Sequence, residues 1–321
     1  MWRRRRSTAP AADGWSVVLD LLFPDGLDPA QLERIRDVVA GRPPSVVAAR
    51  QALGVLDQQT AASPVLIRWG TDDLQLVDVA GCALTLDRAD ASVSAQIADG
   101  AYEPHVAATL DRLLRPGAVF VDVGANVGYH TVRAAQAVGR GRVLAVEANP
   151  ENARLIVHTV EANGLDNVEV LPFALAGHLG HVTFGSHIGS NGGFLASDAA
   201  TASSGRGTLV PTIAMDSLGL ERVDVVKIDV EGAEALVIDG SVEVIARHRP
   251  TFVMEFSVEM TQRVSDRDPR DHLQRFVGWG YSIAVIDRHS NQSVNVESVD
   301  ELLAGWGDLV RIEDLLLTPN D

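Results

Sequence analysis

The feature that most constrains the fold is an apolar run that ends in a glycine-containing turn. Val119–Val123 is a short, mostly apolar run of three valines and a phenylalanine with one aspartate, Asp122, and it is typical of a central parallel strand that is buried on both faces. Gly124 and Gly128 then bracket a turn at which a ligand can approach bare backbone, and a helical pattern follows. This order predicts a nucleotide-type binding site at the end of a strand.

The turn does not match a dinucleotide fingerprint. That fingerprint needs glycine at the first, third and sixth positions of the loop, which here hold Gly124, Asn126 and Tyr129. The second glycine lets the backbone touch a pyrophosphate, so the side chain of Asn126 would crowd that approach. We therefore expect a ligand without a pyrophosphate, which argues against an NAD-dependent oxidoreductase.

Length and composition narrow the class of protein. The 321 residues allow a large core, and 46% of them are hydrophobic. The formal net charge of −16 argues against nucleic-acid binding, which needs a basic face. No run approaches the ~18 apolar residues of a membrane span, and the single cysteine, Cys82, agrees with a reducing compartment. We predict a cytoplasmic protein with a small-molecule partner, and oligomeric state stays open.

Two regions differ in pattern, with a predicted boundary near residue 90. Residues 1–90 predict a small α+β region: helices near 28–41 and 45–53, then an antiparallel meander. The three runs of that meander are 65–69, 74–79 and 82–86.

Residues 91–321 alternate strand and helix patterns, which predicts a doubly wound parallel α/β sheet. A Gly- and Ser-rich segment at 185–207 is predicted to be a loop, either a substrate lid or a disordered insertion. The predicted strands are 119–123, 142–147, 168–171, 223–229, 251–255 and a final antiparallel pair, 281–286 and 309–316.

The turn also resembles motif I of S-adenosylmethionine (SAM) methyltransferases. The motif has the spacing Asp-x-Gly-x-Asn-x-Gly from Asp122. This spacing and the residues around it are similar to those of the FkbM-type O-methyltransferases. The resemblance implies SAM as cofactor and a Rossmann-like, seven-stranded class I methyltransferase sheet. It also implies that the motif residues line the amino-acid and ribose parts of SAM: Asp122, Gly124, Ala125, Asn126 and Gly128.

Glu147 ends the second predicted strand. A carboxylate at this place can accept hydrogen bonds from both ribose hydroxyls, and an exposed helix-cap glutamate is the alternative. The surrounding residues resemble the family's second motif, although Ala148 stands where that motif commonly has proline. Ala148 and Ala174 are also predicted to lie at the cofactor.

The segment at 100–104 resembles a family segment that covers the methionine end of SAM. Tyr102 and Glu103 are therefore predicted cofactor contacts. A simple helix-entry turn, with Pro104 at the first helical position, is the alternative.

A charged signature at 225–234 also matches the family. Lys227, Asp229 and Glu231 share one parity, so on a continuing strand they would face one side. Buried charges are costly unless they are paired. Either the carboxylates meet the ligand, or Lys227 pairs with Asp229, and both can be true. Lys227 is the only lysine in the chain.

Methyl transfer to a hydroxyl requires an in-line acceptor and a base. Asp229 and Glu231 are the leading candidates for the base, His130 is the next candidate, and Lys227 belongs to the same predicted catalytic set. Glu255, at the end of the fifth predicted strand, adds a carboxylate to this rim. Such a rim can bind Mg²⁺, but we predict no metal site.

Together these patterns predict a SAM-dependent O-methyltransferase acting on a hydroxyl of a sugar or a secondary metabolite. The acceptor class comes from the resemblance alone. An N-methyltransferase, an NAD-dependent oxidoreductase and a non-catalytic binding protein of the same fold remain alternatives.

Overall fold

The computed structural model describes residues 67–69, 72–186, 193–196, 207–306 and 311–320. The chain forms two compact units, and the first comprises residues 1–64 with Glu161–Gly164. The helices predicted near 28–41 and 45–53 lie outside the described residues. The domain boundary near residue 90 stays a prediction.

The predicted antiparallel meander is confirmed. β1 (Ile67–Trp69), β2 (Asp72–Val79) and β3 (Cys82–Asp87) pair in that order as an antiparallel sheet. Their buried residues, which include Leu84, share a hydrophobic cluster with Val127 and with α4 (Val93–Ala98). Packing therefore joins this small sheet to the turn that follows the first central strand.

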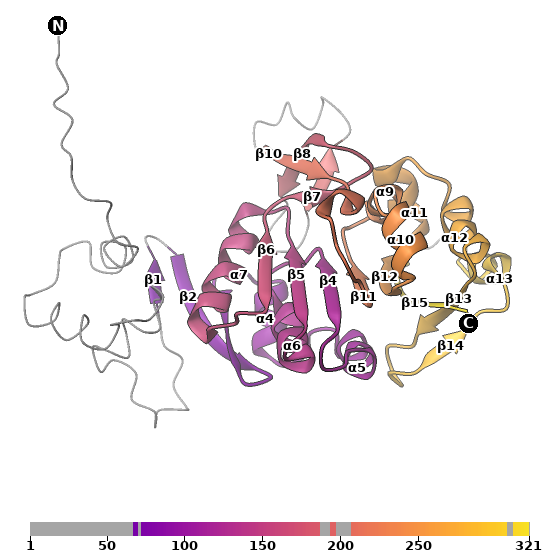
Figure 1. Cartoon of the computed structure of the whole chain (residues 1–321). Coiled ribbons are helices and arrows are strands. Elements are labelled where there is room, and N and C mark those ends of the chain that lie inside the picture. Colours follow the sequence, from indigo (N-terminus) through magenta and orange to yellow (C-terminus); the bar gives the residue numbers. More distant parts are fainter. Residues whose placement is uncertain (1–66, 70–71, 187–192, 197–206, 307–310, 321) are drawn as a thin grey trace, which may run out of the picture. The chain divides into compact units, whose positions relative to one another are not determined.

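The central sheet has eight strands in the order β14-β13-β15-β12-β11-β4-β5-β6 (Figure 1). Its parallel strands are β4 (Val119–Val123), β5 (Arg142–Val146), β6 (Val168–Leu171), β11 (Val225–Ile228) and β12 (Thr251–Phe256). Its antiparallel strands are β13 (Tyr281–Ile286), β14 (Ser293–Asn295) and β15 (Glu313–Pro319). The strand order reverses beside β4, so the carboxyl ends of β4 and β11 border the crevice in which ligands of such sheets bind.

All seven predicted strands are present, and the predicted doubly wound α/β fold is confirmed. The eighth strand, β14, was not predicted. Its sequence, Ser-Val-Asn, carries no hydrophobic pattern, and it forms by pairing at the edge of the sheet with β13.

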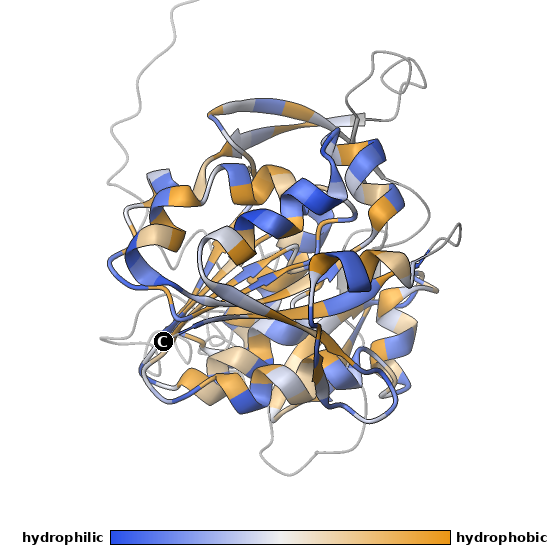
Figure 2. Cartoon of the chain, turned by 90° about the vertical axis from the view of Figure 1, so that its right-hand side faces the viewer, coloured by the Kyte–Doolittle hydropathy of each residue, from blue (hydrophilic) through white to orange (hydrophobic). Residues whose placement is uncertain are grey.

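Helices cover both faces of this sheet, and apolar residues fill the space between the layers (Figure 2). Alternation along β4 divides the core, because Phe120 packs on one side while Val121 and Val123 pack on the other. The first side holds α5 (Pro104–Leu113), α6 (Tyr129–Val138) and α7 (Pro150–Asn163). The second holds α9 (Glu234–Asp239), α10 (Val242–His248), α12 (Pro269–Gly278) and α13 (Val299–Ala304). Short turns complete the set: η1 (Met215–Leu218), α11 (Val258–Met260) and η2 (Thr261–Ser265).

The loop predicted at 185–207 is wrong in part. A four-stranded sheet, ordered β7-β10-β8-β9, uses both ends of this segment and a strand inside it. Its strands are β7 (Ala174–Leu175), β8 (Gly180–Ser186), β9 (Gly193–Ala196) and β10 (Gly207–Ile213). β9 is only four residues long and pairs with β8 through its backbone, so its sequence gives too short a signal. Residues 187–192 and 197–206 lie outside the described residues.

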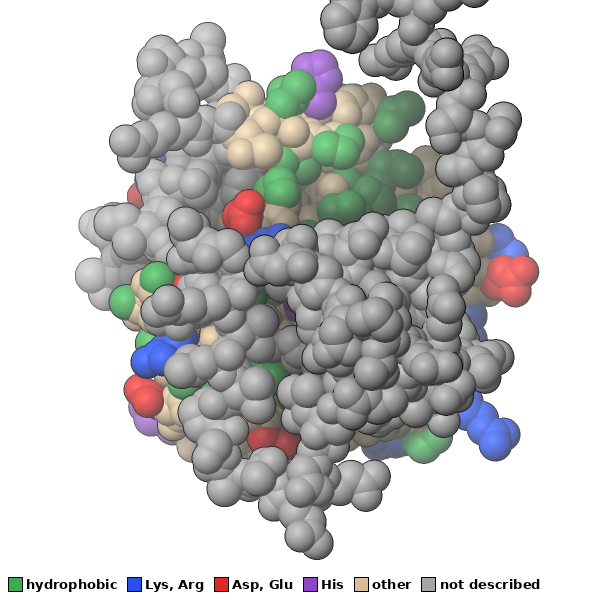
Figure 3. All heavy atoms as spheres, turned by 90° about the vertical axis from the view of Figure 1, so that its left-hand side faces the viewer, with side chains coloured by type: hydrophobic (Ala, Val, Ile, Leu, Met, Phe, Trp, Pro, Cys, Tyr) green, Lys and Arg blue, Asp and Glu red, His purple; other side chains and the backbone are tan. Residues whose placement is uncertain are grey.

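Part of the surface of the four-stranded β7-β10-β8-β9 sheet is apolar. Leu179 and Leu209 are well exposed there, and hydrophobic side chains gather at the top of the face drawn in Figure 3. Within the described residues, no helix is long and apolar enough to cross a membrane.

His272 on α12 is buried in an aromatic cluster. Its ring stacks on Phe256 and meets Phe276 edge-on. Neither ring nitrogen has a hydrogen-bond partner among the described residues. Burial, followed by the positive charge of Arg275, lowers the pKa of His272 to about 4.

We expect acid to destabilise the fold through this residue. Its pKa in an unfolded chain is about 6.5, so protons bind preferentially to the unfolded state between the two values. The stabilisation is complete above about pH 6.5 and is lost as the pH falls toward 4. Between pH 7.5 and pH 5 the loss is about 2 kcal/mol. Urea titrations should show that His272→Phe, which keeps a ring but cannot titrate, loses about 2 kcal/mol less than the wild type. Equal losses would contradict this assignment.

Candidate active site

The glycine turn lies directly against the end of β11. Gly124 and Gly128 have positive φ angles of 76° and 92°, and Asn126 between them has 52°. A Cβ atom at Gly124 would lie 1.8 Å from the carbonyl oxygen of Asp229, so only glycine fits. The turn and the residue that follows β11 therefore form one continuous surface at the switch point.

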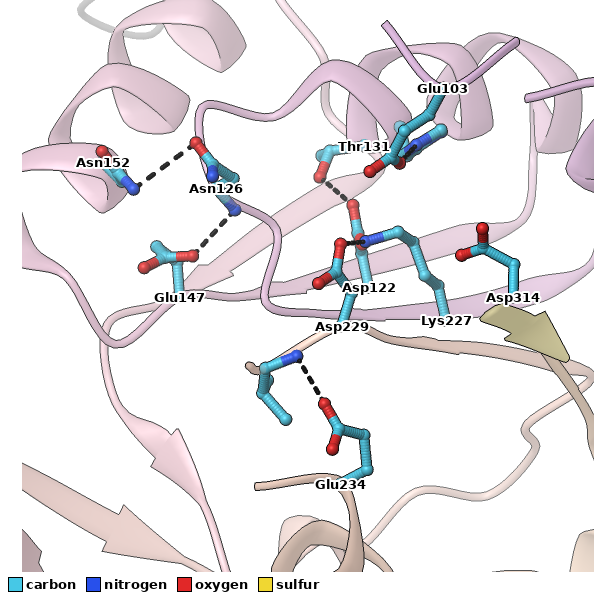
Figure 4. Close-up of polar contacts among 12 residues, drawn as sticks. Glu103, Asp122, Asn126, Thr131, Glu147, Asn152, Lys227, Asp229, Glu234 and Asp314 are labelled. Atoms are coloured by element: carbon cyan, nitrogen blue, oxygen red, sulfur yellow. Dashed lines mark hydrogen bonds and ion pairs between the residues drawn. The ribbon is translucent and has the colours of Figure 1, made fainter. Parts of the chain in front are cut away.

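Glu147, the residue after β5, joins this turn to the next one. Its carboxylate accepts a hydrogen bond from the backbone N–H of Asn126 at 2.7 Å (Figure 4). It accepts another from the backbone N–H of Asn149, also at 2.7 Å. Burial raises the pKa of Glu147 to about 7, and these two hydrogen bonds oppose the rise. Glu147 is only 6% exposed, so it is not an exposed helix cap. Its contact with a ribose stays a prediction.

The sheet register places Asp122 beside Lys227 on the face covered by α6. Asp122 is buried and accepts a hydrogen bond from the hydroxyl of Thr131, on α6, at 2.7 Å. Lys227 Nζ lies 2.9 Å from Oδ2 of Asp229, which shows the internal ion pair that the sequence left as an alternative.

Lys227 is surrounded by carboxylates from several segments (Figure 4). Burial alone would lower its pKa, but the negative charges of Asp229, Asp122 and Glu103 raise it above the usual value. Lys227 is therefore a cation at neutral pH. It donates to Asp229 and cannot accept a proton from a substrate.

The strand alternation that would place Lys227, Asp229 and Glu231 on one side ends after Asp229. The N–H of Asp229 still bonds to the carbonyl of Val123 at 3.0 Å, but Glu231 has a positive φ of 54°. Glu234 stabilises this turn, because its carboxylate accepts from the N–H groups of Val230 and Gly232. No local sequence pattern indicated this role of Glu234.

Glu103 and His130 form a second contact at the site. Their Oε2 and Nε2 atoms lie 2.8 Å apart, and His130 is only 4% exposed. Burial would raise the pKa of Glu103, but the His130 hydrogen bond and the charge of Lys227 lower it to about 2. Tyr102, beside Glu103, meets Tyr129 edge-on. Both predicted contacts from the 100–104 segment thus lie at the site.

A pocket of about 250 Å³ adjoins these groups. Four of its lining side chains are acidic and come from three places in the chain: Glu103 before α5, Asp229 and Glu231 after β11, and Glu255 on β12. The other lining residues are Val93, Gln96, Ala101, Tyr102, Pro104, His105 and Arg288.

His105 and Arg288 were not predicted. Nε2 of His105 and a guanidinium nitrogen of Arg288 lie 2.7 and 3.0 Å from the same oxygen of Asp314. Asp314 on β15 pairs in register with Glu255. Only the folded sheet brings these distant positions together, so no local pattern could reveal them.

The predicted residues thus fall into two groups. Ala125 is buried in the turn and Ala148 follows Glu147, whereas Ala174 lies in β7 of the small sheet. Their contacts with a cofactor stay predictions. In the described part of the chain, no group of three or more His, Cys, Asp or Glu side chains is placed to hold a metal ion.

A family model for the methyltransferase FkbM domain matches residues 122–283, half of the chain. The chain belongs to the FkbM methyltransferase family. This confirms the family predicted from the motifs, and methyltransferase as the enzyme class. The matched region begins on β4 at Asp122 and ends on β13, so it contains the glycine turn, Glu147 and the charged signature.

Individual proteins similar to this FkbM family chain match it either over a short segment or at low sequence identity. Protein-L-isoaspartate O-methyltransferase 2 of Archaeoglobus fulgidus is 39% identical over 71 residues, which are 21% of this chain and 32% of that protein. This chain thus spans about a third of that curated relative. A solved methyltransferase FkbM from Methylobacillus flagellatus has 14% identity and a TM-score of 0.40, covering 64% of this chain and 48% of its own. M. jannaschii TYW2 in complex with AdoMet has 14% identity and a TM-score of 0.40, covering 79% and 90%.

We expect Lys227 to be essential for stability because it neutralises buried carboxylates. Lys227→Met should lower the free energy of unfolding by roughly 3–5 kcal/mol, the usual cost of removing one partner of a buried pair. Adding Asp229→Asn should recover part of this loss. Chemical denaturation measures both effects.

The exposed pair of Arg142 and Glu169 provides the control, since their side chains are 45% and 52% exposed. Arg142→Met should cost no more than about 1 kcal/mol. If Lys227→Met cost as little as this control, the buried pair would not stabilise the fold.

Proposed function

We propose that this FkbM family chain is a SAM-dependent O-methyltransferase that methylates a hydroxyl of a small molecule, a sugar or a secondary metabolite. One observation carries the proposal: an acidic pocket adjoins the glycine turn at the switch point of the sheet. The acidic composition supports a small-molecule acceptor in the cytoplasm over a nucleic acid or a membrane.

Features of the turn support SAM as the cofactor. The bare backbone at Gly124 gives a ligand close access, while the side chain of Asn126 disfavours a pyrophosphate. Glu147 would accept from ribose hydroxyls, and Tyr102 and Glu103 would hold the methionine end. SAM, when bound, supplies an electrophilic methyl group on a positively charged sulfur.

Glu231 is the better base of the two leading candidates. One oxygen of Asp229 is already engaged by Lys227. Burial raises the pKa of Asp229, and the positive charge of Lys227 opposes that rise. Glu231 has no ion-pair partner among the described residues, and burial followed by the negative charge of Asp229 raises its pKa. In this mechanism Glu231 accepts the hydroxyl proton, and Asp229 orients the acceptor by hydrogen bonding.

The other two predicted catalytic residues act through these groups. Lys227 holds Asp229, and His130 holds Glu103. Each is nearly fully buried, so we assign both as positioning residues.

Binding of S-adenosylhomocysteine (SAH) tests the cofactor. Calorimetry should show that SAH binds and NAD does not. Glu147→Gln should weaken SAH at least about tenfold, because the ribose hydroxyls lose a charged acceptor. Glu151→Gln is a matched control, since the Glu151 side chain is 76% exposed on the neighbouring helix. Tight binding of NAD, with no binding of SAH, would contradict the proposal.

Turnover tests the base. Labelled SAM should methylate a member of a small-molecule pool, and Glu231→Gln should lower kcat at least about 100-fold while SAH still binds. A neutral amine needs no strong base, so unchanged turnover in Glu231→Gln and Asp229→Asn would favour an N-methyltransferase. SAH binding without any labelled product would favour a non-catalytic binding protein.

A further inference from the structure

Two carboxylates of the pocket lack a partner. Glu231 and Glu255 both line it, and within the described residues neither makes a hydrogen bond or an ion pair through its side chain. Both are partly shielded from solvent. Burial, followed by the negative charge of Asp229, raises the pKa of each above its usual value.

Each neighbouring acidic group has at least one polar partner, although one oxygen of Asp122 and one of Glu234 have none among the described residues. Glu147 and Glu234 each accept two backbone N–H bonds, Asp229 pairs with Lys227, and Glu103 contacts His130. Asp314, next to Glu255 in the sheet, is held by His105 and Arg288. An unpaired, shielded carboxylate costs free energy. Two of them side by side in one pocket indicate that a ligand brings the missing positive charge.

We propose that Glu231 and Glu255 recognise the positive charge of the SAM sulfonium, so that this site prefers SAM to its product SAH. The inference rests on the proposed function and deepens it. In the reaction the acceptor oxygen bonds to the methyl carbon, and the sulfur–carbon bond breaks with its electron pair staying on sulfur. The hydroxyl proton moves to Glu231. The product sulfur is therefore neutral, and the attraction that held the cofactor is lost.

Two other cations could compensate the same carboxylates. The methionine ammonium is present in both SAM and SAH, so matching it would give no preference between them. A positively charged acceptor would leave the affinities of both cofactors unchanged by mutation. Comparing SAM with SAH therefore separates the three sources of charge.

The test is calorimetry with SAM, SAH and sinefungin, which carries an amine where SAM carries its methylated sulfur. The wild type should bind SAM more tightly than SAH. Glu255→Gln should weaken SAM and sinefungin about tenfold, the effect expected for one charge a few ångströms away in a partly desolvated site. Its SAH affinity should change less than about twofold, which also shows that the variant is folded.

Glu259→Gln is the matched control, because it removes the same charge four residues later from a side chain that is 49% exposed. It should leave all three affinities unchanged. The wild-type preference for SAM should also grow from pH 6 to pH 8, because a carboxyl with a raised pKa must lose its proton before it can attract the sulfonium. This growth should be smaller in Glu255→Gln.

Equal weakening of SAM and SAH in Glu255→Gln would assign the carboxylate to the ammonium and overturn the inference. Unchanged affinities for both cofactors would assign it to the acceptor and overturn it as well. If neither SAM nor SAH bound the wild type, the proposed function itself would fail, which is a distinguishable result.

Discussion

The site depends on one close approach, between the turn after β4 and the residue after β11. The Cα of Gly124 lies so near the carbonyl of Asp229 that no side chain can come between them. This contact sets the distance between the glycine turn after β4 and the acidic turn after β11. Because both strands belong to one hydrogen-bonded register, the placement of one turn determines the placement of the other.

Charge is the second constraint, and the register again explains it. Asp122 and Lys227 are direct neighbours in the sheet, and Glu255 on β12, the next strand after β11, pairs with Asp314 on β15. Their side chains share the α5 and α6 face, so negative charge gathers at one end of the sheet. Lys227 and Arg288 offset this charge, while His130 and His105 contact the carboxylates of Glu103 and Asp314 from neighbouring segments. A single buried cation is thus shared by several carboxylates, and arginine's wider planar fork would meet them differently.

Local sequence patterns were sufficient for much of this arrangement. The strands that carry Asp122, Glu147 and Lys227 are apolar runs with clear ends, so their order and the crevice between them follow from the sequence. The alternation of side chains along a strand predicted Glu231 less well, because the strand ends at Ile228 and Glu231 itself has a left-handed backbone conformation. β9 and β14 are short and form through pairing, which a hydrophobic pattern does not record. The contacts of Asp314 join positions that only the complete sheet brings together.

The matched family region does not enclose the pocket by itself. It supplies three of the pocket carboxylates, Asp229, Glu231 and Glu255, together with the glycine turn. The facing wall comes from residues before the match, between Val93 and His105, and from Arg288 after it. β15, which holds His105 and Arg288 through Asp314, also lies beyond the matched region. The lining of this pocket therefore comes from different parts of the chain, joined where β12 pairs with β15.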